Sequence, residues 1–151
     1  MSPTIFITKR DGTKEHFNAD KINRSIERAC EGLSDPVAMV TQIAIDTRLT
    51  LYDGITTQEL DLATINAAVQ NIKDDIEYDK VATRLFLKTI YRRVIGEYDV
   101  DNPDDLRRKH RDGFIRYIRD GAANSRLHSV MVTKYDLEKL ADALEDRKSV
   151  V

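Results

Sequence analysis

The chain has 151 residues, which is enough for one compact domain, or for one domain with part of a second. Its composition, with 41% hydrophobic and 33% charged residues, is ordinary for a globular protein. Its 24 basic and 26 acidic side chains give a formal net charge of -2, so no overall field attracts polyanions and nucleic acid is not an expected partner. Apolar runs fall far short of the roughly 20 residues that cross a membrane, and the opening residues lack a secretory signal, so a cytoplasmic protein is expected.

The first expected element is a β-hairpin. Residues 4–9 form a β-rich alternating run, and residues 14–17 can return beside them. Between the two runs, Asp11-Gly12 predicts a two-residue type I′ turn, in which both central positions need a positive φ.

Two helices are expected next, each with an apolar face at helical spacing. The first begins at the N-cap residue Asn18 and ends by residues 32–36. Its expected inward residues are Ile22, Ile26, Ala29, Cys30 and Leu33. The second begins at Pro36, which is acceptable in a first helical turn, and is broken by residues 52–54. Its expected inward residues are Val40, Ile43, Ala44 and Thr47.

A third and a fourth helix complete a domain predicted over residues 1–98. Thr56 and Glu59 form a capping-box pattern that opens the third helix. Its expected buried stripe consists of Leu62, Ile65, Val69 and Ile72. The fourth helix runs from about Tyr78 to Gly96, with apolar positions that include Val81, Leu85, Ile90 and Val94. The predicted fold is α+β and mainly α, with a β-hairpin or three-stranded sheet packed on a four-helix bundle.

Residues 99–103 are acidic and end in a proline, which indicates a linker. Two more helical patterns follow it. They are marked by Leu106, Phe114, Tyr117 and Ile118, and then by Leu137, Leu140, Ala141 and Leu144. Two helices with so little apolar material cannot enclose a core of their own. Residues 99–151 are therefore interpreted as a linker with the first helices of an incomplete domain, or as a docking extension.

Motifs for catalysis or metal binding are missing from the sequence. It has no Walker loop, GxGxxG, HExxH or CxxC, and its three histidines are scattered. Its single cysteine, Cys30, falls in an apolar helical pattern that favours a packed thiol over a nucleophile. We therefore expect no catalytic residue and no metal ligand, and hence no enzyme activity of the chain alone.

Three cations recur every four residues on one face of the predicted fourth helix: Arg84, Lys88 and Arg92. No carboxylate occupies the intervening positions, and like charges at this spacing repel by roughly a few tenths of a kcal/mol per pair. An anionic partner is one interpretation of this stripe. A solvated basic face is the other.

A second basic group surrounds the hairpin, where Lys9 and Arg10 lead into the turn, Lys14 leaves it and Lys21 follows in the first helix. The helix N-termini near Asn18 and near Thr56-Thr57 offer unpaired N–H groups and partial positive charge, which both favour phosphate. If cations and termini converge, they would form a triphosphate pocket. Glu15 and Asn18 lie beside this group and could contact a ribose or a base, although each is also an ordinary surface or capping residue.

The chain resembles the ATP-cone domain, first in the string Ile7-Thr8-Lys9-Arg10-Asp11-Gly12 followed by Glu15, Phe17, Asn18 and Lys21-Ile22. Later landmarks occur in the same order: Tyr52-Asp53-Gly54-Ile55 with Thr57, then Tyr78, Ala82-Thr83-Arg84-Leu85 and the run to Gly96. Among such domains, the chain closely resembles the cone at the N-terminus of the large, catalytic subunit of class I ribonucleotide reductase. Residues 106–147 look like the first helices of the next domain of that subunit.

The resemblance implies allosteric control of overall activity. ATP in the cone would keep the reductase active, and dATP in the same site would inhibit it by changing how subunits assemble. The implied partners are the remainder of the large subunit and the small, radical-generating subunit, with dATP-dependent self-association. Mg²⁺ is expected to accompany the nucleotide. The catalytic and redox residues of the reductase lie outside the matched stretch, so the chain alone is not expected to reduce ribonucleotides.

Carried over by position, the resemblance assigns roles within the site. Lys9, Lys21 and Arg92 would hold the phosphates, residues 15–21 would wrap the nucleoside, and Thr57 would contact the sugar or phosphate side. Asp61 stands where related cones often carry a nucleotide-contacting histidine. Together with the basic stripe, the candidate nucleotide-binding residues are Ile7, Lys9, Arg10, Glu15, Phe17, Asn18, Lys21, Ile22, Thr57, Leu60, Asp61, Arg84, Lys88 and Arg92.

Three alternatives are open. In one, the cone belongs to a repressor with a zinc-ribbon head, but such a head needs four cysteines ahead of the cone, whereas this sequence starts on the first strand. In the second, the chain is a helical interaction module whose basic face docks an acidic protein. In the third, the cone is a degenerate scaffold that no longer binds nucleotide.

Overall fold

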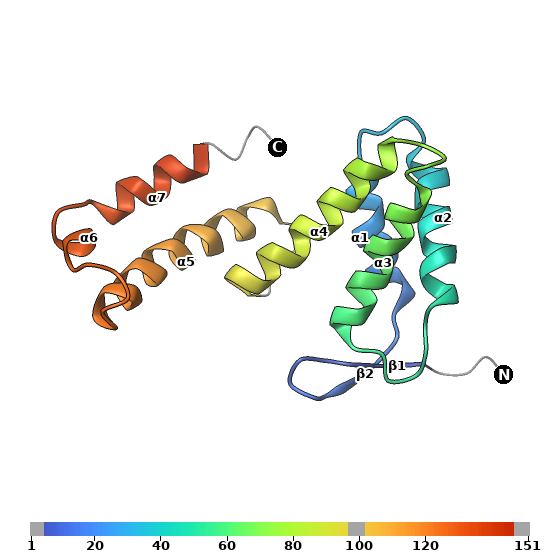
Figure 1. The fold of residues 1–151 in the computed structure, drawn as a ribbon, viewed down its shortest axis with the longest axis horizontal. Coiled ribbons are helices and arrows are strands. Elements are labelled where there is room, and N and C mark those ends of the chain that lie inside the picture. Colours follow the sequence, from blue (N-terminus) through green and yellow to red (C-terminus); the bar gives the residue numbers. More distant parts are fainter. Residues whose placement is uncertain (1–4, 97–101, 147–151) are drawn as a thin grey trace. The chain divides into compact units, whose positions relative to one another are not determined.

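The computed structural model describes residues 5–96 and 102–146 of the chain. These form two compact units, Met1–Ile90 and Tyr91–Val151, which are described separately (Figure 1). The chain is mainly α with one small antiparallel sheet, as predicted. The predicted boundary between residues 98 and 99 lies outside the described residues. Among the helices that are described, none is long and apolar enough to cross a bilayer.

The first unit opens with the hairpin of β1, Phe6–Thr8, and β2, Lys14–His16. The predicted type I′ turn is wrong. The Gly12 amide donates to the Lys9 carbonyl at 3.0 Å, and the Lys9 amide donates to the Thr13 carbonyl at 2.8 Å, which closes a loop one residue longer. Gly12 has a φ of 82°, whereas Asp11 does not have a positive φ. The turn is therefore a type I turn followed by a left-handed glycine. Asp11 favours this form because its carboxylate accepts from the amide and the hydroxyl of Thr13, at 2.9 and 2.6 Å.

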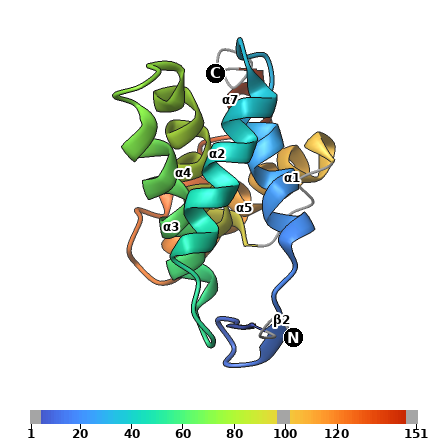
Figure 2. The same cartoon turned by 90° about the vertical axis from the view of Figure 1, so that its right-hand side faces the viewer.

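The sheet has two strands in the described part of the chain, and the third strand that was considered reduces to one parallel bridge between Thr8 and Thr56. Four helices follow: α1 Ala19–Cys30, α2 Pro36–Leu49, α3 Thr57–Asn71 and α4 Glu77–Ile95. The hairpin lies at one end of the bundle that α1, α2 and α3 form, next to the start of α1 and of α3 (Figures 1 and 2).

Capping side chains begin three of these helices where the sequence predicted. The Asn18 side chain accepts from the Asp20 amide at 2.9 Å. The Asp35 side chain accepts from the Ala38 amide at 3.1 Å, immediately before Pro36. Thr56 and Glu59 form the complete capping box that opens α3. Each cap satisfies an amide that lacks a partner within the first helical turn.

The bundle packs around one apolar core. Its largest fully buried side chains are Ile26 of α1, Met39 and Ile43 of α2, and Val81 of α4. The predicted inward face of α1 is confirmed, since Ile26, Ala29 and Cys30 are buried and Ile22 and Leu33 pack against them. Burying a large aliphatic side chain contributes roughly 1.5–3 kcal/mol, so this core is the main source of stability of the unit.

The predicted buried stripe of the third helix is wrong in two of its members, because Leu62 and Val69 are 56% and 48% exposed. The buried residues of α3 are Leu60, Thr64, Ala67 and Ala68. The face is rotated because small side chains allow α3 to approach its neighbours closely, and the hydroxyl of Thr64 is satisfied by the Leu60 carbonyl at 2.9 Å. Similarly, Ile90 of α4 is 40% exposed, although Val81 and Leu85 are buried.

The second unit contains α5 Pro103–Ala123, the short α6 Val130–Thr133 and α7 Leu137–Asp146. The expectation that these helices cannot enclose a core of their own is wrong. Ile115 and Ile118 of α5 pack with Leu137 and Ala141 of α7 in a small core. Arg111 of α5 also binds α7, through the carboxylates of Asp142, at 2.7 Å, and of Glu138. Two helical patterns were predicted here, and α6 is an additional turn between them.

Candidate functional site

The hairpin is bonded to the loop between α2 and α3, and Thr8 provides most of the bonds. Its amide donates to the Ile55 carbonyl at 2.9 Å, and its hydroxyl donates to the Gly54 carbonyl at 3.0 Å. Its carbonyl accepts from the Thr57 hydroxyl at 3.3 Å. The Gly54 amide in turn donates to the Phe6 carbonyl at 2.9 Å. These bonds hold β1 against the N-terminal end of α3.

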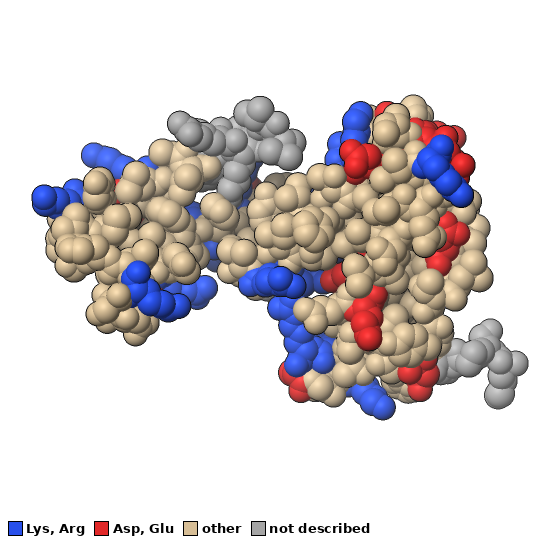
Figure 3. All heavy atoms as spheres, in the orientation of Figure 1, with Lys and Arg blue, Asp and Glu red and all other residues tan. Residues whose placement is uncertain are grey.

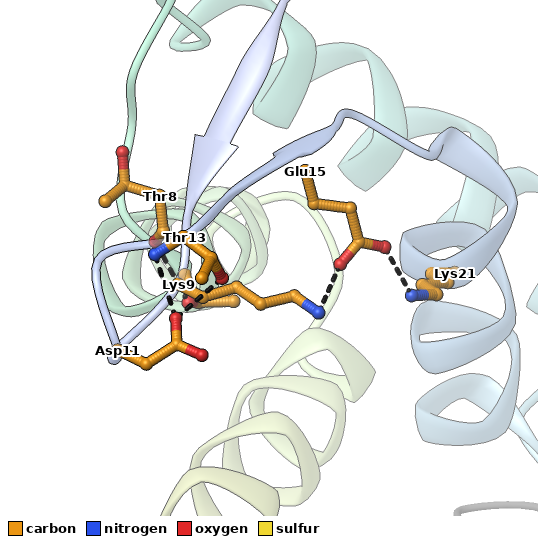
Figure 4. A network of polar contacts seen from close by, with 7 residues as sticks. Thr8, Lys9, Asp11, Thr13, Glu15 and Lys21 are labelled. Carbon is orange, nitrogen blue, oxygen red and sulfur yellow. Dashed lines mark hydrogen bonds and ion pairs between the residues drawn. The ribbon is translucent and has the colours of Figure 1, made fainter.

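A carboxylate on the second strand lies between two lysines (Figure 4). The Lys9 Nζ atom lies 2.6 Å from Glu15 Oε2, and the Lys21 Nζ atom lies 2.8 Å from Glu15 Oε1. Lys9 comes from the end of β1 and Lys21 from the start of α1, so two elements direct ammonium groups to one point. We call Lys9, Glu15 and Lys21 the hairpin triad. Basic and acidic side chains both lie on the surface around the hairpin (Figure 3).

The electrostatics of the hairpin triad keep its carboxylate charged. Hydrogen bonds from Lys21 and from Lys9, together with their positive charges, lower the pKa of Glu15 to about 2. Glu15 is therefore ionised at any physiological pH. With two ammonium groups and one carboxylate, the triad carries a net charge of about +1, which favours an incoming anion.

Other candidate residues lie near the triad along the hairpin and at the start of α1. Arg10 is exposed in the turn, whereas Ile7 is half-buried opposite Glu15 in the strand register. The Asn18 side chain is occupied as the N-cap of α1. Phe17 and Ile22 line a hollow of about 10 Å³, which holds one water molecule at most. This hollow is far too small for a nucleotide, so a ligand would lie outside it.

Three candidates lie in the first turns of α3. The Thr57 hydroxyl bonds the Thr8 carbonyl, and Asp61 is half-buried. Leu60 is 5% exposed, which makes its side chain part of the protein interior. These positions are adjacent to the hairpin because the Thr8 bonds bring β1 to this end of the helix.

Two side chains of the basic stripe, Arg84 and Lys88, bind another helix of the same unit, which periodicity did not predict. Arg84 Nη1 donates to the carbonyl oxygens of Ala29 and Glu31, at 2.9 and 2.8 Å. Lys88 Nζ lies 2.5 Å from the Ser25 hydroxyl. Both side chains thus bind α1. The phosphate-binding role of Arg92, which belongs to the second unit, stays a prediction.

Sequence reasoning missed the residues that hold the hairpin. Thr8 and Asp53-Gly54 were noted as part of a β-rich run, as a helix break and as family landmarks, but no contact between them was predicted. The structure shows the Asp53 carboxylate accepting from the Phe6 amide at 2.9 Å. A short aspartate-glycine turn before a capping box is a signal that could have indicated a docking point, but its partner, 47 residues away, could not be identified.

Groups for nucleophilic or metal chemistry are not gathered in the described part of the chain. No set of three or more His, Cys, Asp or Glu side chains is placed there to hold a metal ion. Burial raises the pKa of the Cys30 thiol to about 11, although the nearby charge of Arg84 opposes this shift. The thiol is therefore protonated and inaccessible, as expected for a packed cysteine.

The chain is similar to known proteins over most of its length. A family model described as the ATP cone domain matches residues 5–93, more than half of the 151-residue chain. The chain is 36% identical over 100 residues to the ribonucleoside-diphosphate reductase subunit alpha of Haemophilus influenzae, and 31% identical over 143 residues to that of Chlamydia trachomatis. It is 32% identical over 100 residues to the ribonucleoside-diphosphate reductase 1 subunit alpha of Escherichia coli.

These matches cover 66%, 93% and 66% of the chain, in the same order, but the chain spans only 13% of the length of each relative. The matched region contains the hairpin, the bundle and all three members of the hairpin triad. With its family model, its fold and its relatives in agreement, the chain belongs to the ATP-cone family.

Proposed function

We propose that the chain binds ATP or dATP and acts as an allosteric regulatory module of a ribonucleotide reductase. The observation that carries this proposal is the convergence of Lys9 and Lys21 on one point, 2.6 and 2.8 Å from the two oxygens of Glu15, in a member of the ATP-cone family. Ammonium groups form short, charge-assisted hydrogen bonds with phosphate oxygens, so the same pair suits a triphosphate.

The neighbouring elements suit the rest of the ligand. The first turn of α1 presents amides and the positive end of a helix dipole beside Lys21. Residues 15–21 connect Glu15 and Lys21 of the triad through the N-cap of α1, where a nucleoside would be wrapped. Thr57 is held near the hairpin by its bond to Thr8. Mg²⁺ would enter with the triphosphate, whose oxygens are its usual ligands.

The proposed output is control of a larger enzyme. The relatives are named as reductase alpha subunits, and the chain corresponds to a small part of their length. In this proposal ATP sustains overall reductase activity and dATP lowers it through subunit assembly, which involves the small subunit and self-association. The chain itself performs no ribonucleotide reduction and supplies only the regulatory site.

Isothermal titration calorimetry with ATP, dATP and GTP tests the proposal on the wild-type chain and on Lys9→Ala and Lys21→Ala. Each variant removes a charged donor, so we expect affinity for ATP and dATP to fall roughly tenfold or more. Lys73→Ala is the matched control, because Lys73 is an exposed cation after α3, at the end of that helix away from the hairpin. It should bind like wild type.

Two results would contradict the proposal. Equal affinities in wild type, Lys9→Ala and Lys21→Ala would remove the site from the hairpin triad. The second result is that calorimetry detects no binding of any adenine nucleotide, although circular dichroism shows that the chain is folded. This result would favour a degenerate cone or a docking module instead.

A further inference from the structure

We propose that Glu15 is an internal counterion that occupies the phosphate position when no nucleotide is bound, and that a polyphosphate must displace it from Lys9 and Lys21 in order to bind. This inference rests on the proposed function, since it concerns how the same site is regulated. It assigns Glu15 a role in the ligand-free state that is separate from any contact with a nucleoside.

The geometry is that of an anion already bound. Each oxygen of the Glu15 carboxylate takes one lysine, with Oε2 at 2.6 Å from Lys9 and Oε1 at 2.8 Å from Lys21. A phosphate group also presents neighbouring oxygens that can each accept from one ammonium group. The carboxylate and a phosphate therefore compete for the position between the two ammonium groups, which only one of them can occupy.

Displacement is mechanically simple. Glu15 is anchored at its backbone, because β2 pairs with β1 and places it opposite Ile7. Its side chain is 36% exposed, and those of Lys9 and Lys21 are 49% and 64% exposed. The carboxylate can rotate into solvent without any change in the core, and the lysines can follow an incoming ligand.

Protonation is not a route to release. Because the lysines lower the pKa of Glu15 to about 2, the carboxylate stays charged through the whole physiological range. Lowering the pH within that range therefore does not free the lysines, whereas a competing anion can. An anion with one or two charges binds the lysines little more strongly than the tethered carboxylate does. A triphosphate carries more charge and binds them strongly enough to displace it. The counterion thus raises the selectivity of the cone for polyphosphates over inorganic monophosphate.

The test uses inorganic tripolyphosphate as the probe, because it has no sugar or base with which Glu15 could interact. Calorimetry on Glu15→Gln, which keeps the shape and removes the charge, should give a Kd for tripolyphosphate roughly threefold to tenfold lower than that of wild type, in line with the modest strength of exposed ion pairs. Asp74→Asn is the control, since it makes the same change in net charge beyond the far end of α3 and should leave the Kd unchanged.

A second readout follows displacement directly in the wild-type chain. Carbon-13 NMR of the Glu15 carboxyl should show no titration above pH 4 without ligand, because both lysines hold the group ionised. With saturating tripolyphosphate the carboxylate loses these partners and lies near negative charge, so titration should become visible between pH 4 and 6. A resonance that stays flat with ligand bound would show that Glu15 keeps its lysines.

The outcomes separate this inference from the proposed function. If wild type binds tripolyphosphate and ATP but Glu15→Gln binds tripolyphosphate no more tightly, the counterion role is wrong and the nucleotide site stands. If the folded variant binds tripolyphosphate and wild type does not, the carboxylate is the block, which supports the inference. If neither protein binds either ligand, both proposals fail.

Discussion

The guanidinium group of Arg84 lies 2.8 Å from the main-chain oxygen of Glu31, the residue that caps the C-terminal end of α1. The same nitrogen lies 2.9 Å from the Ala29 carbonyl. Carbonyl groups in a last helical turn lack amide partners and carry the negative end of the helix dipole, so a cation is favourable there. Arg84 thus joins α4 to α1 by capping the latter.

We expect Arg84→Ala to lower the free energy of unfolding by about 1–2 kcal/mol, because it removes a charged donor from two carbonyl groups. The affinity for ATP should stay unchanged. Urea unfolding and calorimetry of the same preparations measure the two quantities. Lys80→Ala, which removes an exposed cation from α4 whose partner Glu77 lies 3.8 Å away, serves as the control and should change neither. A loss of ATP affinity without a loss of stability would restore Arg84 to the phosphate site.

The hairpin triad should affect how the free energy of unfolding falls at acidic pH. The pKa of Glu15 is lowered to about 2 in the folded chain, from a usual value of 4.5. A lowered carboxyl pKa stabilises the fold above the unfolded-state value and loses that contribution as the pH falls toward the folded-state value. Between about pH 4.5 and 2, wild type should therefore lose more stability than Glu15→Gln. Urea unfolding at pH 6, 4 and 3 measures this, and parallel pH profiles for the two proteins would refute it.

The Thr8 hydroxyl should control the mobility of the hairpin. Thr8→Val keeps the shape of the side chain but removes its bond to the Gly54 carbonyl at 3.0 Å. A net loss of about 1 kcal/mol should raise amide exchange of β1 and β2 roughly fivefold, while exchange of the α1 core residues changes little. Thr41→Val is the control, since the Thr41 hydroxyl bonds a carbonyl of its own helix on an exposed surface. Unchanged exchange in Thr8→Val would show that the main-chain bonds suffice.

Two glycines of α5 should respond in opposite directions to the same substitution. A Cβ atom at position 113 would meet only Ile95 Cγ2, at an ordinary 3.5 Å, so Gly113→Ala should stabilise the second unit by about 0.5–1 kcal/mol through helix propensity. A Cβ atom at position 121 would lie 2.7 Å from Leu127 Cδ1 and 2.9 Å from Leu127 Cγ. Gly121→Ala should therefore destabilise it by about 1–3 kcal/mol.

Amide exchange of Ile118 and Ala141 in the full chain measures both effects, because these residues belong to the core of the second unit. The two variants share the gain in helix propensity, so their difference isolates the contact with Leu127. Similar exchange in Gly113→Ala and Gly121→Ala would mean that Leu127 moves away at little cost.

Much of the fold could be predicted from local sequence. The N-caps at Asn18, Asp35 and Thr56 act within three residues of themselves, so the starts of α1, α2 and α3 follow from neighbouring side chains alone. The strong apolar periodicity of α1 likewise marked its buried face. The order of family landmarks identified the ATP cone, which the family model over residues 5–93 bears out.

The errors arose where one local preference competes with another or with packing. At the turn, the carboxylate of Asp11 bonds Thr13 and so selects a longer loop. On α3, periodicity favoured Leu62 and Val69 because they are large, whereas close helix packing buries Ala67 and Ala68.

The composition and spacing of the chain determined by themselves that cations cluster near the hairpin and recur along α4. Which groups these cations face was decided only by tertiary structure. Glu15 receives Lys9 and Lys21 because the hairpin folds back toward the start of α1, and Arg84 reaches a carbonyl 53 residues away because the bundle brings α4 within reach of the end of α1. Helix and strand preferences act over a few residues, whereas the partner of a long side chain depends on how whole elements pack, and no spacing rule carries that information.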